Sequence, residues 1–218
     1  MQGNSTKALI IIGILTPVIA GIFGLYQGYF TNYGSDMHST PQIKAAEPKK
    51  YSQIVNAPFF VSQMFFPYGY MGDVHGITVD KNYNLKRGGN IIDCTRVTYR
   101  PRDVKWMGVH WLYPDGNWGD KPGSMLVNAS KIHLLATSLS GIANVQFGMG
   151  GINDSSKHYQ GTSQIRTNVV ALNEQFKPIT IEINKGATEY LLSAFFVLGK
   201  QSQNTKGFDI CLADLKYL

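Results

Sequence analysis

Residues 178–183 read PITIEI, and the alternation of side chains in this stretch is typical of a β-strand with one buried face. Ile179, Ile181 and Ile183 fall on one side of an extended chain, and the polar residues between them fall on the other. Similar short runs, rich in β-branched or aromatic residues and bounded by Gly, Asn, Asp or Pro, recur after residue 51. Eight further segments are expected to be strands: residues 57–64, 90–100, 106–113, 131–137, 144–150, 163–172, 191–199 and 208–217.

These segments predict an all-β domain. No helical period of ten residues stands out between residues 51 and 218. Short strands separated by turn residues favour a two-sheet antiparallel jelly-roll sandwich over residues 51–218. The composition agrees, with 23 Gly, 9 Pro, 11 Phe and 12 Tyr but only 16% charged residues. Such a composition excludes a coiled coil, a highly charged disordered chain and a helical bundle.

The amino-terminal part has a different character. Residues 8–30 read ALIIIGILTPVIAGIFGLYQGYF and carry no charge. As a helix, this stretch would be about 34 Å long, enough to cross the hydrocarbon core of a bilayer. A cleaved signal peptide has a shorter apolar run and a small-residue cleavage site. The sequence therefore favours one amino-terminal transmembrane helix, a signal-anchor within residues 1–30, with a cleaved signal peptide as the alternative.

The charges around this stretch predict its orientation. Lys7 precedes it, and the first charge after it is Asp36. The positive-inside preference then places the amino terminus in the cytoplasm and residues 51–218 on the periplasmic or extracellular side of the membrane. Residues 31–50 are polar and poor in large hydrophobic side chains, which is typical of a tether. A loop packed against the domain is the alternative.

The overall charge argues against one class of partner. The chain has a net charge of +6, and four of its basic and two of its acidic residues precede residue 51, so the remainder carries +4. No cluster or stripe of Lys and Arg appears, so nucleic acid is not an expected partner despite the basic pI.

Two cysteines, Cys94 and Cys211, each lie within an expected strand. In an oxidising exterior an even number of cysteines favours a disulfide, here between an early strand and the last one. Two buried free thiols are the alternative, because cysteine also behaves as a small hydrophobic residue.

Four segments together resemble a known group of domains: FFPYGYMGD (65–73), WMGVHWLYPDGNWGDKPGS (106–124), VQFGMGGI (145–152) and ICLADLKYL (210–218). In this order they are similar to a bacterial group of galactose-binding-like jelly rolls related to family 11 carbohydrate-binding modules. The complex I intermediate-associated proteins resemble the same superfamily and act through protein partners. The resemblance covers residues 60–218 and is more specific for the fold than for the function.

The resemblance also implies a structural Ca²⁺ ion near the joined ends of the jelly roll, with Asp73 and Asp214 as its carboxylate ligands. The chain departs from the group's pattern at Tyr70, where the group has Trp, and at Ala213, where it has the first residue of an Asp-Asp pair.

Sugar binding by such a domain needs flat aromatic faces together with polar groups that reach the hydroxyls. All three tryptophans lie within residues 106–118, and strand alternation puts Trp106 and Trp111 on opposite faces, so that one of them is expected in the core. A tryptophan in a recurring fold motif more often packs in the fold than contacts a sugar, and for each of the three packing is the favoured role. The candidate carbohydrate-binding residues are Tyr113, Asp115, Asn117, Trp118 and Asp120.

The sequence offers no recognisable catalytic or transition-metal motif. It contains no Gly-x-Ser-x-Gly elbow and no His-x-His or His-Glu-x-x-His cluster, so the chain is not expected to be an enzyme. A glycosidase using Asp115 or Asp120 is held in reserve. The favoured function is a membrane-anchored, non-catalytic module that binds a polysaccharide. The alternative is an accessory or assembly subunit that binds the protein subunits of a larger membrane complex.

Overall fold

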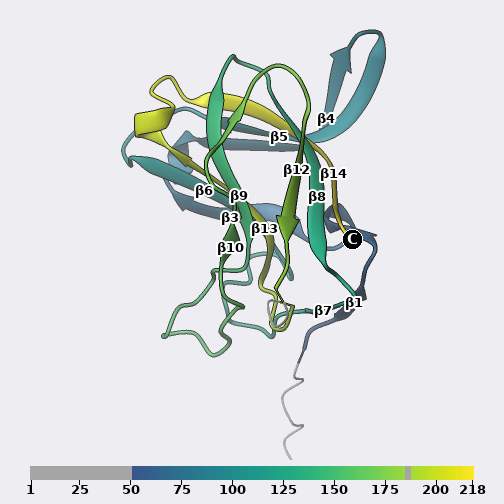
Figure 1. Cartoon of the computed structure of the whole chain (residues 1–218). Helices are drawn as coiled ribbons and strands as arrows, with labels where there is room; N and C mark the ends of the chain where they lie inside the picture. Colours follow the sequence, from purple (N-terminus) through teal and green to yellow (C-terminus); the bar gives the residue numbers. More distant parts are fainter. Residues whose placement is uncertain (1–50, 185–187) are drawn as a thin grey trace, which may run out of the picture. The chain divides into compact units, whose positions relative to one another are not determined.

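The computed structural model describes residues 51–184 and 188–218, which lie within one compact unit, Pro48–Leu218 (Figure 1). Among these described residues, no helix has the length and apolar character needed to cross a membrane. The predicted signal-anchor (1–30) and tether (31–50) lie outside them.

Two six-stranded sheets form the domain, and every pairing within them is antiparallel. The first, here called the β8 sheet, has the order β12 (Lys177–Glu182), β8 (Lys131–Ser138), β14 (Phe208–Tyr217), β5 (Asn90–Tyr99) and β4 (Ile77–Arg87), with β2 (Phe59–Phe60) also paired to β14. The second, the β6 sheet, has the order β10 (Ile165–Arg166), β9 (Ala143–Met149), β13 (Ser193–Lys200), β6 (Trp106–Leu112) and β3 (Phe66–Gly72), with β11 (Val170–Leu172) also paired to β9.

Alternate side chains of both sheets enter one hydrophobic core. Ile132 and Leu134 extend into it from β8, and Met107, Val109 and Trp111 extend into it from β6. All five side chains are buried, as the period-two pattern of their strands requires. The expected all-β architecture with two antiparallel sheets is therefore confirmed.

Several expected strand boundaries were wrong. The segment 57–64 is only partly extended, since β2 gives way to the short 3₁₀ helix η1 (Val61–Gln63). The segment 163–172 is split into β10 and β11, and strands β3 and β4 were not expected. A small parallel pair, β1 (Ile54–Asn56) with β7 (Met125–Val127), adds a pairing that a purely antiparallel fold would lack.

A disulfide joins Cys94 of β5 to Cys211 of β14, two neighbouring strands of the β8 sheet. Both sulfur-bearing side chains are buried in a second apolar cluster with Leu85 and Ala213. The bond links residues that are 117 positions apart in the sequence.

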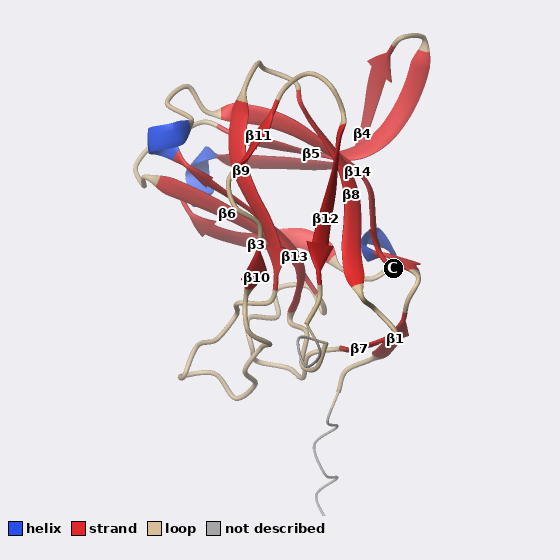
Figure 2. Ribbon diagram, in the orientation of Figure 1, coloured by secondary structure: helices blue, strands red, loops and turns tan. Residues whose placement is uncertain are grey.

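The two ends of the sandwich differ. The long loops that follow β6 and β9 gather at one end, drawn in tan at the lower end of Figure 2. The short helices η2 (Val74–Gly76) and η3 (Gln201–Gln203) lie at the other end. There the Asp73 N–H donates to the Trp106 carbonyl and the Gln201 N–H donates to the Lys105 carbonyl, each at 2.9 Å, so both helices border the start of β6.

Tyr217 connects the two sheets through a buried hydrogen bond. Its hydroxyl donates to the Ala194 carbonyl at 2.6 Å, where the β13–β6 register shifts. Burial raises the pKa of Tyr217, so its hydroxyl stays a neutral donor. We expect Tyr217→Phe to lower the free energy of unfolding by about 1–2 kcal/mol, because it leaves a buried carbonyl without this donor. Urea denaturation of the two proteins measures the difference, and equal midpoints would contradict the assignment.

Candidate functional site

The loop after β6 holds the residues that the sequence nominated for sugar binding. Asn117, at its centre, is only 3% exposed. Its side-chain amide donates to the carbonyls of Tyr113 and Lys121 at 3.2 and 3.1 Å, and its side-chain oxygen accepts the N–H groups of Gly119 and Lys121 at 3.2 and 3.0 Å. Asn117 therefore organises the loop, and its amide is already occupied by backbone groups.

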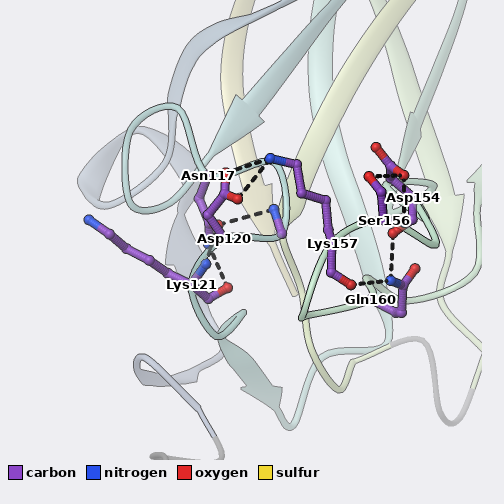
Figure 3. Close-up of polar contacts among 8 residues, drawn as sticks. Asn117, Asp120, Lys121, Asp154, Ser156, Lys157 and Gln160 are labelled. Atoms are coloured by element: carbon purple, nitrogen blue, oxygen red, sulfur yellow. Dashed lines mark hydrogen bonds and ion pairs between the residues drawn. The ribbon is translucent and has the colours of Figure 1, made fainter. Parts of the chain in front are cut away.

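Asp120 ties this loop to the next one (Figure 3). Its two carboxylate oxygens accept from the Lys157 ammonium at 2.7 and 3.0 Å. The second loop is held by its own contacts, since Asp154 accepts from the Ser156 hydroxyl and the Gln160 amide donates to the Lys157 carbonyl. Asp120 thus pairs with a cation and not with a second carboxylate.

The aromatic residues of the same loop pack inward. Trp118 lies against the cluster of Leu112, Ile152 and Leu192, and its ring centre is 5.8 Å from that of His110. Tyr113 packs at the edge of the main core. Asp115 is exposed. The five predicted residues share one loop, but the structure does not arrange them as a single open aromatic face.

Asp73 and Asp214, the predicted Ca²⁺ ligands, each contact other groups of the chain. Asp73 is 2% exposed, and its carboxylate accepts the Arg102 N–H at 2.6 Å. The Asp214 carboxylate is held by the Lys216 ammonium at 2.9 Å, and His133 lies 3.6 Å away. The residues described here contain no group of three or more His, Cys, Asp or Glu side chains that could hold a metal ion. Each carboxylate thus has its own partner in the structure, a backbone N–H for Asp73 and an ammonium for Asp214.

Strand alternation correctly places one of the first two tryptophans in the core. Trp111 is 2% exposed and contacts Phe195 there, whereas Trp106, the first residue of β6, is 38% exposed. Trp106 was not among the nominated sugar-binding residues, although its position opposite to Trp111 in the strand pattern was the signal that could have identified it.

Two glycines lie beneath the Trp106 indole. A Cβ atom added to Gly72 would come 2.9 Å from Cδ2 of Trp106, and one added to Gly108 would come 3.4 Å from Cζ3. Gly72 also has φ +71°, a left-handed conformation that favours glycine. Since side chains are missing at both positions, the indole lies close to the backbone of β3 and β6. The ring is thus supported on one side and partly open to solvent.

An open hollow of about 490 Å³ surrounds this ring. Its lining residues come from the start of β6, the end of β13 and the segment that follows β13: Lys105, Trp106, Lys200, Gln201, Ser202 and Thr205. The lining combines one flat aromatic side chain with side chains that form hydrogen bonds, which is the combination that binds a sugar ring and its hydroxyls.

The rim formed by η3 is fixed by Asn204. This buried side chain donates to the carbonyls of Asn144 and Lys200 at 2.9 and 3.0 Å and accepts the Asn144 N–H at 2.9 Å. The backbone of η3 is further joined to β6 through Gln201 and Lys105. The rim is therefore held in place before any ligand binds.

The comparisons with known proteins show similarity in structure only. No family model matches this chain, and no curated protein matches its sequence. The structure is similar to the family 11 carbohydrate-binding module of the cellulosomal cellulase Lic26A-Cel5E of Clostridium thermocellum, at 12% identity and a TM-score of 0.43 over 74% of this chain and 92% of that one. It is similar as well to the family 30 carbohydrate-binding module of the cellulosomal cellulase Cel9D-Cel44B of the same organism, at 14% identity and a TM-score of 0.43. This match covers 75% of this chain and 94% of that one. The structure is also similar to an exo-β-agarase, at 6% identity and a TM-score of 0.45. This match covers 74% of this chain and 24% of the agarase chain.

Proposed function

We propose that residues 51–218 form a carbohydrate-binding domain in which Trp106 is the platform for a sugar ring. The observation that carries this proposal is the exposed indole supported by Gly72 and Gly108. An apolar ring face that is already positioned can stack on the apolar face of a pyranose without ordering a mobile side chain first. Gln201, Ser202 and Thr205, which line the same hollow, supply polar groups for the hydroxyls.

The proposed binding is non-catalytic. Glycoside hydrolysis generally uses two carboxyl groups, about 5–9.5 Å apart, on either side of the scissile bond. The residues that line the hollow include neither Asp nor Glu. Asp120, a carboxylate held in reserve for hydrolysis, is engaged with Lys157 in the loop after β6.

The proposal places the domain on the periplasmic or extracellular side of a membrane, anchored by residues 8–30. The Cys94–Cys211 disulfide supports this location, because such bonds persist in oxidising compartments. The uninterrupted apolar sequence of residues 8–30 supports the anchor.

We expect Trp106→Ala to weaken retention on polysaccharide at least tenfold, since it removes the stacking surface. The full-length chain, kept in a mild non-ionic detergent, would be tested on cellulose, chitin, xylan and polygalacturonate. Phe60→Ala is the matched control, because Phe60 is also an exposed aromatic residue but lies in the β8 sheet. Trp118→Ala tests the loop that the sequence favoured.

Loss of retention in Trp118→Ala with full retention in Trp106→Ala would move the binding site to that loop. If the wild-type chain binds none of a broad glycan panel, the proposed function is wrong.

A second function is favoured by the edge of the β6 sheet. Among the strands that the structure describes, β3 pairs only with β6, and it exposes Tyr68, Tyr70 and Met71. An exposed edge strand with apolar side chains is a surface on which another protein can pair. An accessory subunit of a membrane complex would use this strand, and mild-detergent purification from the native membrane followed by mass spectrometry would recover its partners in fixed stoichiometry.

A further inference from the structure

The position of Lys200 relative to Trp106 indicates what kind of sugar the hollow accepts. Lys200, the last residue of β13, is the register partner of Trp106 in the antiparallel β13–β6 pair. Side chains of directly opposed residues lie on the same face, with their Cβ atoms about 4.5–5.5 Å apart. The Lys200 ammonium can therefore reach the rim of the indole from the neighbouring strand. Lys105, adjacent to Trp106 in the sequence, lines the same hollow.

Both lysines are available for a ligand. Each is exposed, and neither forms an ion pair with any residue in the described part of the chain. No carboxylate lines the hollow to balance their charge. What these two lysines have in common is their place, since both line the hollow beside the exposed Trp106 ring.

Beside Gln201, Ser202 and Thr205, the lining carries two ammonium groups, which a neutral sugar does not require. Neutral hydroxyls both donate and accept hydrogen bonds, so the groups that bind them include acceptors, such as carboxylate and amide oxygens. A lysine ammonium has three donors and no acceptor, and it forms its strongest hydrogen bonds with anionic oxygens. Two ammonium groups near one aromatic platform therefore match a pyranose that carries a negative charge.

We propose that the hollow around Trp106 binds an anionic polysaccharide, with a pyranose ring on the indole and its carboxylate or sulfate group between Lys105 and Lys200. This inference rests on the proposed carbohydrate-binding function and specifies its ligand class. The ring stacking supplies recognition of a sugar, and the two lysines select sugars with a negative charge.

The test compares acidic and neutral polymers with the full-length chain in non-ionic detergent. Polygalacturonate supplies carboxylates, carrageenan supplies sulfates, and mixed-linkage β-glucan supplies neither. We expect binding to at least one acidic polymer to be tenfold or more tighter than to the glucan and to weaken with added salt, since exposed charges are screened. Lys105→Gln/Lys200→Gln should lose this preference. Lys86→Gln/Lys177→Gln, which removes two exposed lysines from the β8 sheet, should keep it.

The remaining outcomes separate the two proposals. Retention on polygalacturonate alone, on carrageenan alone or on both identifies the anionic group and supports the inference. If the chain binds the neutral glucan as tightly as the acidic polymers, and this binding depends on Trp106, the inference is overturned but the carbohydrate-binding function is supported. If Trp106→Ala still binds the acidic polymer, and the chain binds single-stranded DNA as tightly as that polymer, the binding is a general attraction to polyanions. That result would overturn the inference that the hollow selects an anionic sugar. No binding to any polysaccharide would overturn both.

Discussion

Loss of the Cys94–Cys211 disulfide is expected to lower the free energy of unfolding of the domain by about 4 kcal/mol. The bond closes a loop between residues 117 positions apart. In the chain-entropy model, a cross-link over about 100 residues removes up to about 4.7 kcal/mol of conformational freedom from the unfolded chain. The free energy of unfolding of a small domain is only about 5–15 kcal/mol, so this one bond would account for a large share of the stability of the domain.

The folded state should change little when the bond is lost. Cys94 and Cys211 lie among apolar side chains, including Leu85 and Ala213, and they would remain buried as thiols. Urea denaturation of residues 48–218, with and without a reductant, measures the effect. Cys94→Ala/Cys211→Ala is the control, because a reductant should leave its stability unchanged. A difference below about 1 kcal/mol between oxidised and reduced wild type would contradict the expected contribution of the cross-link.

The sequence predicted the strands whose side chains alternate or are apolar throughout, and these include the edge strand β12 as well as interior strands. The pattern PITIEI corresponds to β12, where Ile179 and Ile181 are buried and Thr180 and Glu182 are exposed. Strands β6, β8, β9, β13 and β14 were found in the same way. Burial on one face gives a clear period-two signal that needs no information from the rest of the chain.

Two other edge strands, β3 and β4, were not predicted. β4 reads ITVDKNYNLKR, and a register shift between Asp80 and Tyr83 breaks its alternation. β3 contains Pro67, which cannot donate to a strand ladder and is tolerated at an edge. Edge strands are partly in contact with solvent, so tertiary pairing decides their conformation more than local pattern does.

The candidate site was only partly predictable for a related reason. The sequence identified the region 106–120 by its aromatic and polar residues, but it could not show which side chains pack together. Asn117 is buried by backbone contacts within its loop, and Lys200 lies next to Trp106 only through the β13–β6 register. Trp106 and Lys200 are about 95 positions apart in the sequence and line the same hollow because their strands pair. The spacing of residues along the chain does not reveal which strands pair or in what register.

His110 is expected to make the domain less stable in acid. It is 3% exposed, and burial lowers its pKa from 6.5 to about 4. Its Nδ1 lies 2.8 Å from the Ser193 hydroxyl oxygen, and the ring packs against Phe196 and Trp118. The Ser193 hydroxyl donates to the Phe195 carbonyl, so it accepts from Nδ1–H of a neutral imidazole. None of these neighbours carries a charge that could stabilise an imidazolium.

The direction of the stability change with pH follows from the number of protons that the folded and unfolded states bind. Below pH 6.5 the unfolded chain binds a proton at His110, whereas the folded domain does not do so until pH approaches 4. The unfolded state is therefore stabilised relative to the folded state as the pH falls through this window. Between pH 7.5 and pH 4.5 this linkage costs about 2–3 kcal/mol of stability, at 1.36 kcal/mol per pKa unit.

Urea denaturation of residues 48–218 at both pH values tests this expectation, with His110→Gln as the comparison. The glutamine amide can still donate to Ser193 but does not titrate. Carboxylates titrate in both proteins, so the difference between their two pH dependences isolates His110. We expect the variant to be the less stable protein at pH 7.5 and to lose about 2–3 kcal/mol less than the wild type on acidification. Parallel pH profiles would mean that His110 is protonated in the folded domain, and that its packing against Trp118 admits water or a compensating anion.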